Sequence, residues 1–359
     1  MNRLCQTSYG NLEAVINLAG YDGNNKRRLV HFVRHHTNGK WYKGDIVSSN
    51  PFSGGSIIQN STKRISPQDY GDFEVLVLEE DGLMKHYTRD NTICPHSGQY
   101  AWRLSTTVNK QPDPHYGKVV VCDAAPLHLS KIPVGDSSNG TALETALLTN
   151  TGDVLHYRCP QQWHNSKDIS PQWELTDRIT TGATGPACLY TDSRDILTAL
   201  IPLDDGIVQF SFMNGAWSRV SCIPRASGPA CTYNPNPAEP LTLYVVARRA
   251  DELSVNVRSA TRNQRKVWEW SPSQVQLPSP LRRLFWDSHY MQQHANPMAI
   301  VSQSLNVLGH SANAEAIVFH PCGTGWQDRW MILHWSCLTG SQEWIVSGVV
   351  LNEVMGIPM

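Results

Sequence analysis

Carboxylates and imidazoles recur at matching places along the first half of the chain. The two sets are Glu13, Glu74 and Glu144, and His31, His86 and His156. A pair of carboxylates could provide the acid and the base of a glycosidase. Regular repetition fits a scaffold better than a single reaction centre, so we interpret both sets as structural.

Three arginines follow these histidines closely, and a guanidinium group can donate hydrogen bonds to a ligand oxygen. They are Arg34, Arg89 and Arg158. We predict that they bind substrate at the ends of their strands. A solvated or strand-bridging role is the alternative.

Histidines and aromatic residues also gather in the long connecting segments. We predict a catalytic role for four of them, namely His289, Tyr290, His294 and His164. We predict a substrate-binding role for Trp163, His96, Trp286 and Tyr100. Together these side chains could line one apolar pocket and donate hydrogen bonds to a carbonyl oxygen that gains charge.

The sequence lacks the motifs of several common kinds of catalysis and ligand binding. The chain lacks a glycine-rich phosphate loop, an HExxH zinc motif and a GxSxG elbow, so we expect no cofactor. Its nine cysteines show no C-x-x-C spacing, so we expect no metal. A formal net charge of -1 does not favour nucleic acid.

Membrane and secretion signals are also missing from the sequence. No apolar run approaches the ~18 residues of a spanning helix. The first residues contain no apolar stretch of the signal-peptide type. We therefore expect a cytoplasmic protein that binds no membrane, or a secreted one if a leader was removed.

One module of sequence returns along the chain. Tyr9-Gly-Asn-Leu-Glu, Leu29-Val-His-Phe-Val-Arg34 and Trp41 reappear as Tyr70-Gly-Asp-Phe-Glu, His86-Tyr-Thr-Arg89 and Trp102. A looser copy runs from Ala142 to Trp173. Repeats of this length, built from short strands and tight turns, are typical of propeller blades.

The repeats predict an all-β protein, a β-propeller of four-stranded blades in a single domain over residues 1–359. Six blades are favoured and seven are the alternative. We place the blades near 9–60, 70–123, 142–191, 195–233, 241–285 and 297–350, each with its outer strand last. Residues 3–8 resemble an outer strand without a preceding blade, so we expect them to complete the last blade and close the ring.

Two further features follow from the repeats. Turns at Asp81-Gly82, Gly152-Asp153 and Asp205-Gly206 should join the first two strands of their blades, because a tight hairpin needs positive φ. A tryptophan series should pack between blades or, in a lectin, stack on sugar; its members are Trp41, Trp102, Trp173, Trp217 and Trp268.

The Gly10-Asn-Leu-Glu and Leu29-Val-His-Phe-Val-Arg34 motifs, with their copies in the next repeat, resemble the fucose-type β-propeller lectins of bacteria and fungi. The resemblance is strongest over residues 9–105 and partial to about 217. It implies sugar sites between neighbouring blades, against aromatic faces, and a fucosylated glycan as partner.

In overall character the chain also resembles the fungal hetero-Diels–Alderases of tropolonic sesquiterpenoid biosynthesis, because its early blades are lectin-like and its later ones have drifted. This resemblance implies a cofactor-free cyclase that joins a tropolone quinone methide to a humulene-type alkene. Positioning alone could supply ~7–11 kcal/mol of the barrier. We take the cyclase, with a small hydrophobic substrate, as the first hypothesis and the lectin as the alternative. Homodimerisation is left open.

Overall fold

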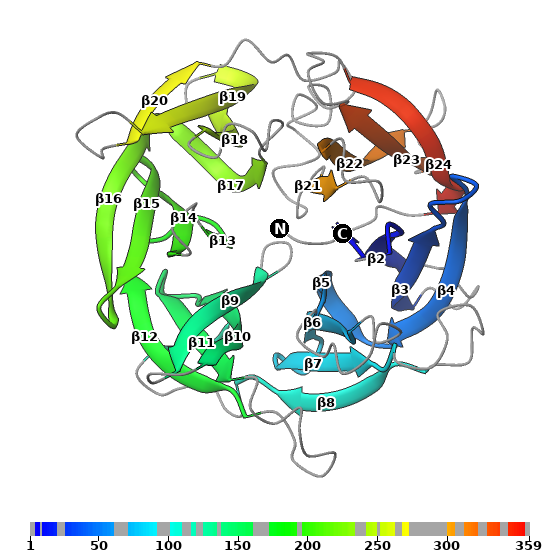
Figure 1. The fold of residues 1–359 in the computed structure, drawn as a ribbon, viewed down its shortest axis with the longest axis horizontal. Helices are drawn as coiled ribbons and strands as arrows, with labels where there is room; N and C mark the ends of the chain where they lie inside the picture. The colour runs from blue at the N-terminus through cyan, green and yellow to red at the C-terminus, as the bar shows by residue number, and fades with distance from the viewer. Residues whose placement is uncertain are drawn as a thin grey trace.

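The structure is a computed structural model in which every described element is a β-strand (Figure 1). It describes residues 4–7, 9–19, 26–60, 71–91, 101–109, 116–119, 125–134, 138–160, 172–191, 196–233, 242–249, 252–262, 268–272, 300–305, 312–321, 329–337 and 344–355. These strands form six antiparallel four-stranded sheets arranged as a ring. The described part of the chain therefore confirms a β-propeller of six blades.

Each blade uses four strands that are consecutive in the sequence, and the first strand of each lies nearest the centre of the ring (Figure 1). The first three blades consist of β1 (Leu4–Gln6), β2 (Leu12–Ala19), β3 (Arg27–Arg34) and β4 (Trp41–Ser48); β5 (Pro51–Gln59), β6 (Phe73–Glu79), β7 (Met84–Arg89) and β8 (Arg103–Thr107); and β9 (Leu127–Val134), β10 (Ser138–Leu148), β11 (Val154–Pro160) and β12 (Glu174–Thr180).

The last three blades repeat this order. They consist of β13 (Cys188–Thr191), β14 (Leu197–Leu203), β15 (Gly206–Met213) and β16 (Ala216–Pro224); β17 (Ala226–Tyr233), β18 (Thr242–Arg249), β19 (Glu252–Arg262) and β20 (Trp268–Pro272); and β21 (Ile300–Leu305), β22 (Ala312–Pro321), β23 (Arg329–Cys337) and β24 (Trp344–Met355).

The core lies in the layers between blades. Strand β6 is buried along nearly its whole length because neighbouring blades cover both of its faces, and its sequence is accordingly an almost unbroken apolar run. Between the first two blades, Val15 and Leu29 pack against Ile57, Phe73 and Val75. Burying a side chain of this size contributes about 1.5–3 kcal/mol.

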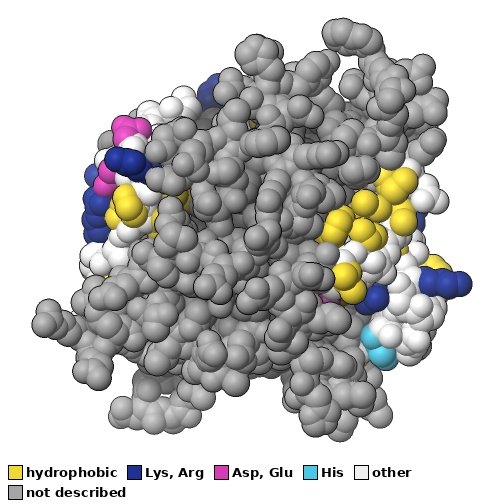
Figure 2. Space-filling model, turned by 90° about the horizontal axis from the view of Figure 1, so that it is seen from above, with side chains coloured by type: hydrophobic (Ala, Val, Ile, Leu, Met, Phe, Trp, Pro, Cys, Tyr) yellow, Lys and Arg dark blue, Asp and Glu magenta, His cyan; other side chains and the backbone are white. Residues whose placement is uncertain are grey.

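The outermost strands face solvent on the wall of the ring. Strand β4 has exposed and half-buried residues from Trp41 to Ile46, and only Val47 and Ser48 at its end are buried. On β24, Ile345, Val346 and Val349 are exposed. Figure 2 shows hydrophobic side chains on the right-hand wall, the side on which β24 and β4 lie in Figure 1. No described segment forms a helix long and apolar enough to cross a membrane.

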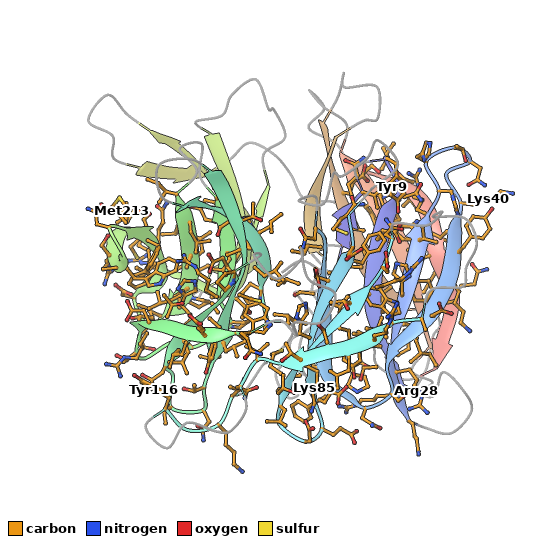
Figure 3. All side chains as sticks on the ribbon, turned by 60° about the horizontal axis from the view of Figure 1, so that its bottom comes forward. Tyr9, Arg28, Lys40, Lys85, Tyr116 and Met213 are labelled. Atoms are coloured by element: carbon orange, nitrogen blue, oxygen red, sulfur yellow. The ribbon has the colours of Figure 1, made fainter. Side chains whose placement is uncertain are left out.

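The predicted hairpin turns are present between the second and third strands of their blades. Gly82, Gly152 and Gly206 all have positive φ, at 77°, 82° and 143°. At Gly206 a Cβ atom would lie 2.2 Å from the carbonyl oxygen of Ile223, so this position tolerates no side chain. Figure 3 separates the two rims: Arg28 and Lys85 lie at the rim of these turns, and Tyr9, Lys40 and Met213 lie at the other.

The predicted blade boundaries were wrong by one strand. Residues 55–60 were predicted as the outer strand that ends the first blade, but β5 pairs with β6 and is the innermost strand of the second blade. Residues 186–191 differ in the same way, because β13 pairs with β14. The repeat was identified from Tyr9 onward, one strand after each blade begins, so the strand between repeats was assigned to the wrong side.

The predicted closing strand was wrong for the same reason. Strand β1 pairs with β2, with Cys5 opposite Glu13, and is the innermost strand of the first blade. The last blade has four strands of its own, β21 to β24, and the structure describes no strand exchange between it and the N-terminus. The last and first blades instead meet through side chains, with the rings of His334 and Trp41 5.5 Å apart.

Candidate functional site

Four blades contain the same buried pair of a glutamate on the second strand and a histidine on the third. In each pair the histidine Nε2 lies 2.7–2.8 Å from a carboxylate oxygen. The pairs are Glu13–His31, Glu74–His86, Glu144–His156 and Glu315–His334. The structural interpretation of the first three agrees with this burial. The fourth pair was not predicted from the sequence, although Ile-Leu-His334-Trp has the same pattern as Leu-Val-His31-Phe.

A tryptophan from the next blade packs edge-on against each of these histidines. The ring centroids of the four pairs are 5.2–5.6 Å apart. The indole N–H of Trp173 donates to His86 Nδ1 at 3.3 Å, and that of Trp217 donates to His156 Nδ1 at 3.2 Å. Because an indole N–H can only donate, Nδ1 of His86 and of His156 is the acceptor. The Nε2–H of each ring then donates to its glutamate.

We call each glutamate, histidine and following tryptophan a Glu–His–Trp unit; such units join the blades from the sixth through the first to the fourth. The fourth blade has Thr198 and Gln209 at the register positions of the glutamate and histidine. Gln209 instead donates to the Tyr190 hydroxyl of its own blade, at 2.9 Å. The fifth blade has Tyr244 and Val257 at these positions. The units thus hold one side of the ring, as the inter-blade packing interpretation of the tryptophans predicts.

The three predicted arginines do not form one set. Arg34 and Arg89 are register equivalents, opposite Leu12 and Phe73. Arg158 lies opposite Glu144, one position earlier, and therefore points to the other face of its blade.

Each arginine also has a different partner. Arg34 donates from Nε to the Gly39 carbonyl at 3.1 Å, within its own hairpin loop. Arg89 donates from Nη1 to His31 Nδ1 of the preceding blade at 3.1 Å. Arg158 donates from Nε to Glu144 at 2.8 Å.

At the junction between the third and fourth blades a cation lies against aromatic rings. The Arg158 guanidinium lies 5.2 Å from the centre of the Phe212 ring, and Phe212 lies 5.3 Å from Trp217. About a fifth of the Arg158 side chain (22%) is exposed. Among the described residues only its Nε has a hydrogen-bond partner.

Two titratable groups lie beneath Arg158. Burial raises the pKa of the Glu144 carboxyl, but hydrogen bonds from His156, Arg158 and Ser130 outweigh burial, so the pKa lies below its usual value. Burial lowers the pKa of His128 to about 4. His128 contacts the Thr191 hydroxyl of the fourth blade. At neutral pH this junction therefore contains the Glu144 carboxylate, the Arg158 guanidinium and an uncharged His128 imidazole.

The other predicted site residues lie outside the described residues: His289, Tyr290, His294, His164, Trp163, His96, Trp286 and Tyr100. Their proposed roles stay predictions. Within the described ranges no group of three or more His, Cys, Asp or Glu residues could hold a metal ion.

No family model and no curated protein matches the sequence. Solved structures do match over nearly the whole chain. A variant of the Aleuria aurantia lectin in complex with Fucα1-6GlcNAc has a TM-score of 0.56 at 14% identity, over 97% of this chain and 94% of the lectin. A lectin from Burkholderia pseudomallei has a TM-score of 0.54 at 11% identity, over 97% of this chain and 82% of that one.

A second structure of the Aleuria aurantia lectin, described as a six-bladed β-propeller with a novel mode of fucose recognition, has a TM-score of 0.52 at 13% identity. It covers 97% of this chain and 94% of the lectin. At these identities the likeness shows the fold alone. This chain has the six-bladed propeller fold that these lectins share.

Proposed function

We propose that the protein binds carbohydrate at the junction between its third and fourth blades. The observation that carries the proposal is the Arg158 guanidinium, which lies over an aromatic ring at this junction with terminal nitrogens that no described residue engages. Sugars offer hydroxyl oxygens to such donors and apolar ring faces to aromatic side chains. The fold shared with fucose-binding lectins supports the proposal.

The Glu–His–Trp unit holds the side chains at this junction in place. Glu144 fixes Arg158 from below, and the Trp217 indole is fixed by its hydrogen bond to His156. A ligand that meets preorganised donors loses less affinity to the ordering of side chains. Several sites of modest affinity on one ring would add avidity for glycan-coated surfaces.

The test is titration calorimetry with methyl α-L-fucoside. Arg158→Lys keeps a positive charge beside Glu144 but loses the planar fork of donors. Because hydrogen bonds to charged groups are worth about 1.5–3 kcal/mol, we expect affinity to fall about ten- to hundred-fold. Arg219→Lys is the matched control, because Arg219 is an exposed arginine on β16 that pairs with Asp205.

Two results would overturn this proposal. One is a wild-type protein that binds no fucoside while its melting curve shows an intact fold. The other is equal affinity in the Arg158→Lys and Arg219→Lys proteins.

The hetero-Diels–Alderase hypothesis stays a second candidate. It depends on His289, Tyr290, His294, His164 and Trp163, all outside the described residues. Its test is the rate and stereochemistry of adduct formation from a tropolone quinone methide and humulenol. Product formation at the uncatalysed rate, with no stereochemical preference, would remove it.

A further inference from the structure

The junction between the first and second blades differs from the two that follow it. There Arg89, rather than a tryptophan, donates to the histidine Nδ1. The Trp102 ring still packs edge-on against His31. The buried Nε1 of Trp102 has no hydrogen-bond partner, while Arg89 occupies the acceptor nitrogen of His31.

Arg89 itself is only partly engaged. Its Nη1 donates to His31, while its buried Nε has no partner in the structure. When Nη1 is occupied, Nε and Nη2 form the opposite edge of the guanidinium, which is the edge that binds a carboxylate through two parallel hydrogen bonds. An unpaired buried donor costs about 1–3 kcal/mol, so a ligand that accepts from this edge recovers that free energy.

The local backbone favours this arrangement of Arg89. Gly44 lies beside His31, and a Cβ atom at Gly44 would be 2.7 Å from His31 Nδ1. A side chain at this position would therefore compete with the Arg89 guanidinium for the same space. The guanidinium also lies 5.6 Å from the centre of the Phe73 ring, which fixes its plane.

The charge of Arg89 is not neutralised by direct contact. Among the described residues it has no carboxylate within ion-pair distance, whereas Arg158 pairs directly with Glu144. Arg89 is linked to the Glu13 carboxylate through the His31 ring, because His31 bonds Arg89 at Nδ1 and Glu13 at Nε2. Tyr9 lies at the same junction, half-buried at the rim, and accepts a hydrogen bond from Asn91.

We propose that this junction is a binding site for the carboxylate group of a small organic acid, such as a sugar acid. The carboxylate accepts two hydrogen bonds from the Nε and Nη2 edge of Arg89 and a third from the Trp102 indole. The site uses only donors and a cation, so it discriminates against neutral ligands. It is separate from the junction that contains Arg158 and does not depend on the function proposed for that junction.

The test is titration calorimetry of the full chain with sodium glucuronate and with the methyl ester of glucuronic acid. The ester keeps the sugar but removes the charge. We expect saturable binding of glucuronate that weakens as salt rises, and at least tenfold weaker binding of the ester. Arg89→Lys should weaken glucuronate binding at least tenfold, and Trp102→Phe several-fold.

Arg219→Lys serves as the control, and melting curves establish that each variant is folded. Equal binding of glucuronate and its ester would overturn the proposal, as would unchanged affinity in the folded Arg89→Lys protein. Sulfate that displaces glucuronate at equal concentration would also overturn the carboxylate assignment, because the site would then bind any oxyanion. Loss of fucoside binding in Arg158→Lys with intact glucuronate binding would show that the two sites are distinct.

Discussion

Two tryptophans at equivalent junctions provide a measurement of one buried hydrogen bond. Trp173 donates to His86 Nδ1, whereas the Trp102 indole has no acceptor and Arg89 donates to His31 Nδ1 in its place. Substitution by phenylalanine removes the indole N–H and part of the ring in both cases. Only Trp173→Phe leaves a buried histidine acceptor without its partner.

The structure sets the size and sign of the difference in stability between Trp173→Phe and Trp102→Phe. A buried acceptor that loses its donor costs about 1–3 kcal/mol. Trp102→Phe instead removes an unsatisfied donor, which offsets part of its packing loss. Trp102 is only 9% exposed and Trp173 is half-buried, so the packing loss works against the expected order. We expect Trp173→Phe to lower the free energy of unfolding by about 1–3 kcal/mol more than Trp102→Phe.

The assay is equilibrium unfolding in urea, followed by circular dichroism, with the m-value used to check that both variants unfold alike. Trp217→Phe is an independent repeat, since its indole donates to His156 Nδ1. If Trp102→Phe proved as destabilising as Trp173→Phe and Trp217→Phe, the hydrogen-bond assignment at these junctions would be refuted.

Three further predictions concern turns and pH. Gly206→Ala should destabilise the fold by more than Gly82→Ala, which meets open space and costs about 1 kcal/mol of backbone strain, as thermal melts can show. The folded pKa of Glu144 is depressed, so its contribution to stability is present above the unfolded pKa and is lost as pH falls through the folded pKa; Glu144→Gln should flatten the acid limb of a stability–pH curve. His128 resists protonation in the folded state, because burial lowers its pKa from 6.5 to about 4. The folded state should therefore lose stability as pH falls from 6.5 to about 4. His128→Asn should remove this loss, as urea unfolding at a series of pH values can show.

The sequence predicted the parts of the fold that depend on short-range pattern. The spacing of Asp81-Gly82 and Asp205-Gly206 marked hairpins because tight turns need positive φ. The repeated Glu74 and His86 indicated a scaffold position because the same pair occurs in other blades. These features are local, so a single sequence contains them.

The pairing of strands and side chains that are distant in the sequence was harder to predict. The repeat starting at Tyr9 has the correct period but does not mark where a blade begins, so β5 was assigned to the wrong blade. Arg158 resembled Arg34 and Arg89, yet a shift of one residue in register points it to the opposite face. The unsatisfied donors of Arg89 and Trp102 depend on how side chains of two blades meet around His31, which only the three-dimensional arrangement reveals.

The placement of β1 within the first blade has a mechanical consequence. Every described sheet is continuous in sequence, so the seam between the sixth and first blades is held by side chains such as His334 and Trp41 and not by a shared ladder of backbone hydrogen bonds. Under tension or partial denaturation this seam should part by sliding of two packed surfaces, with each sheet left whole. Circular permutation would then only have to move the chain break from one seam to another.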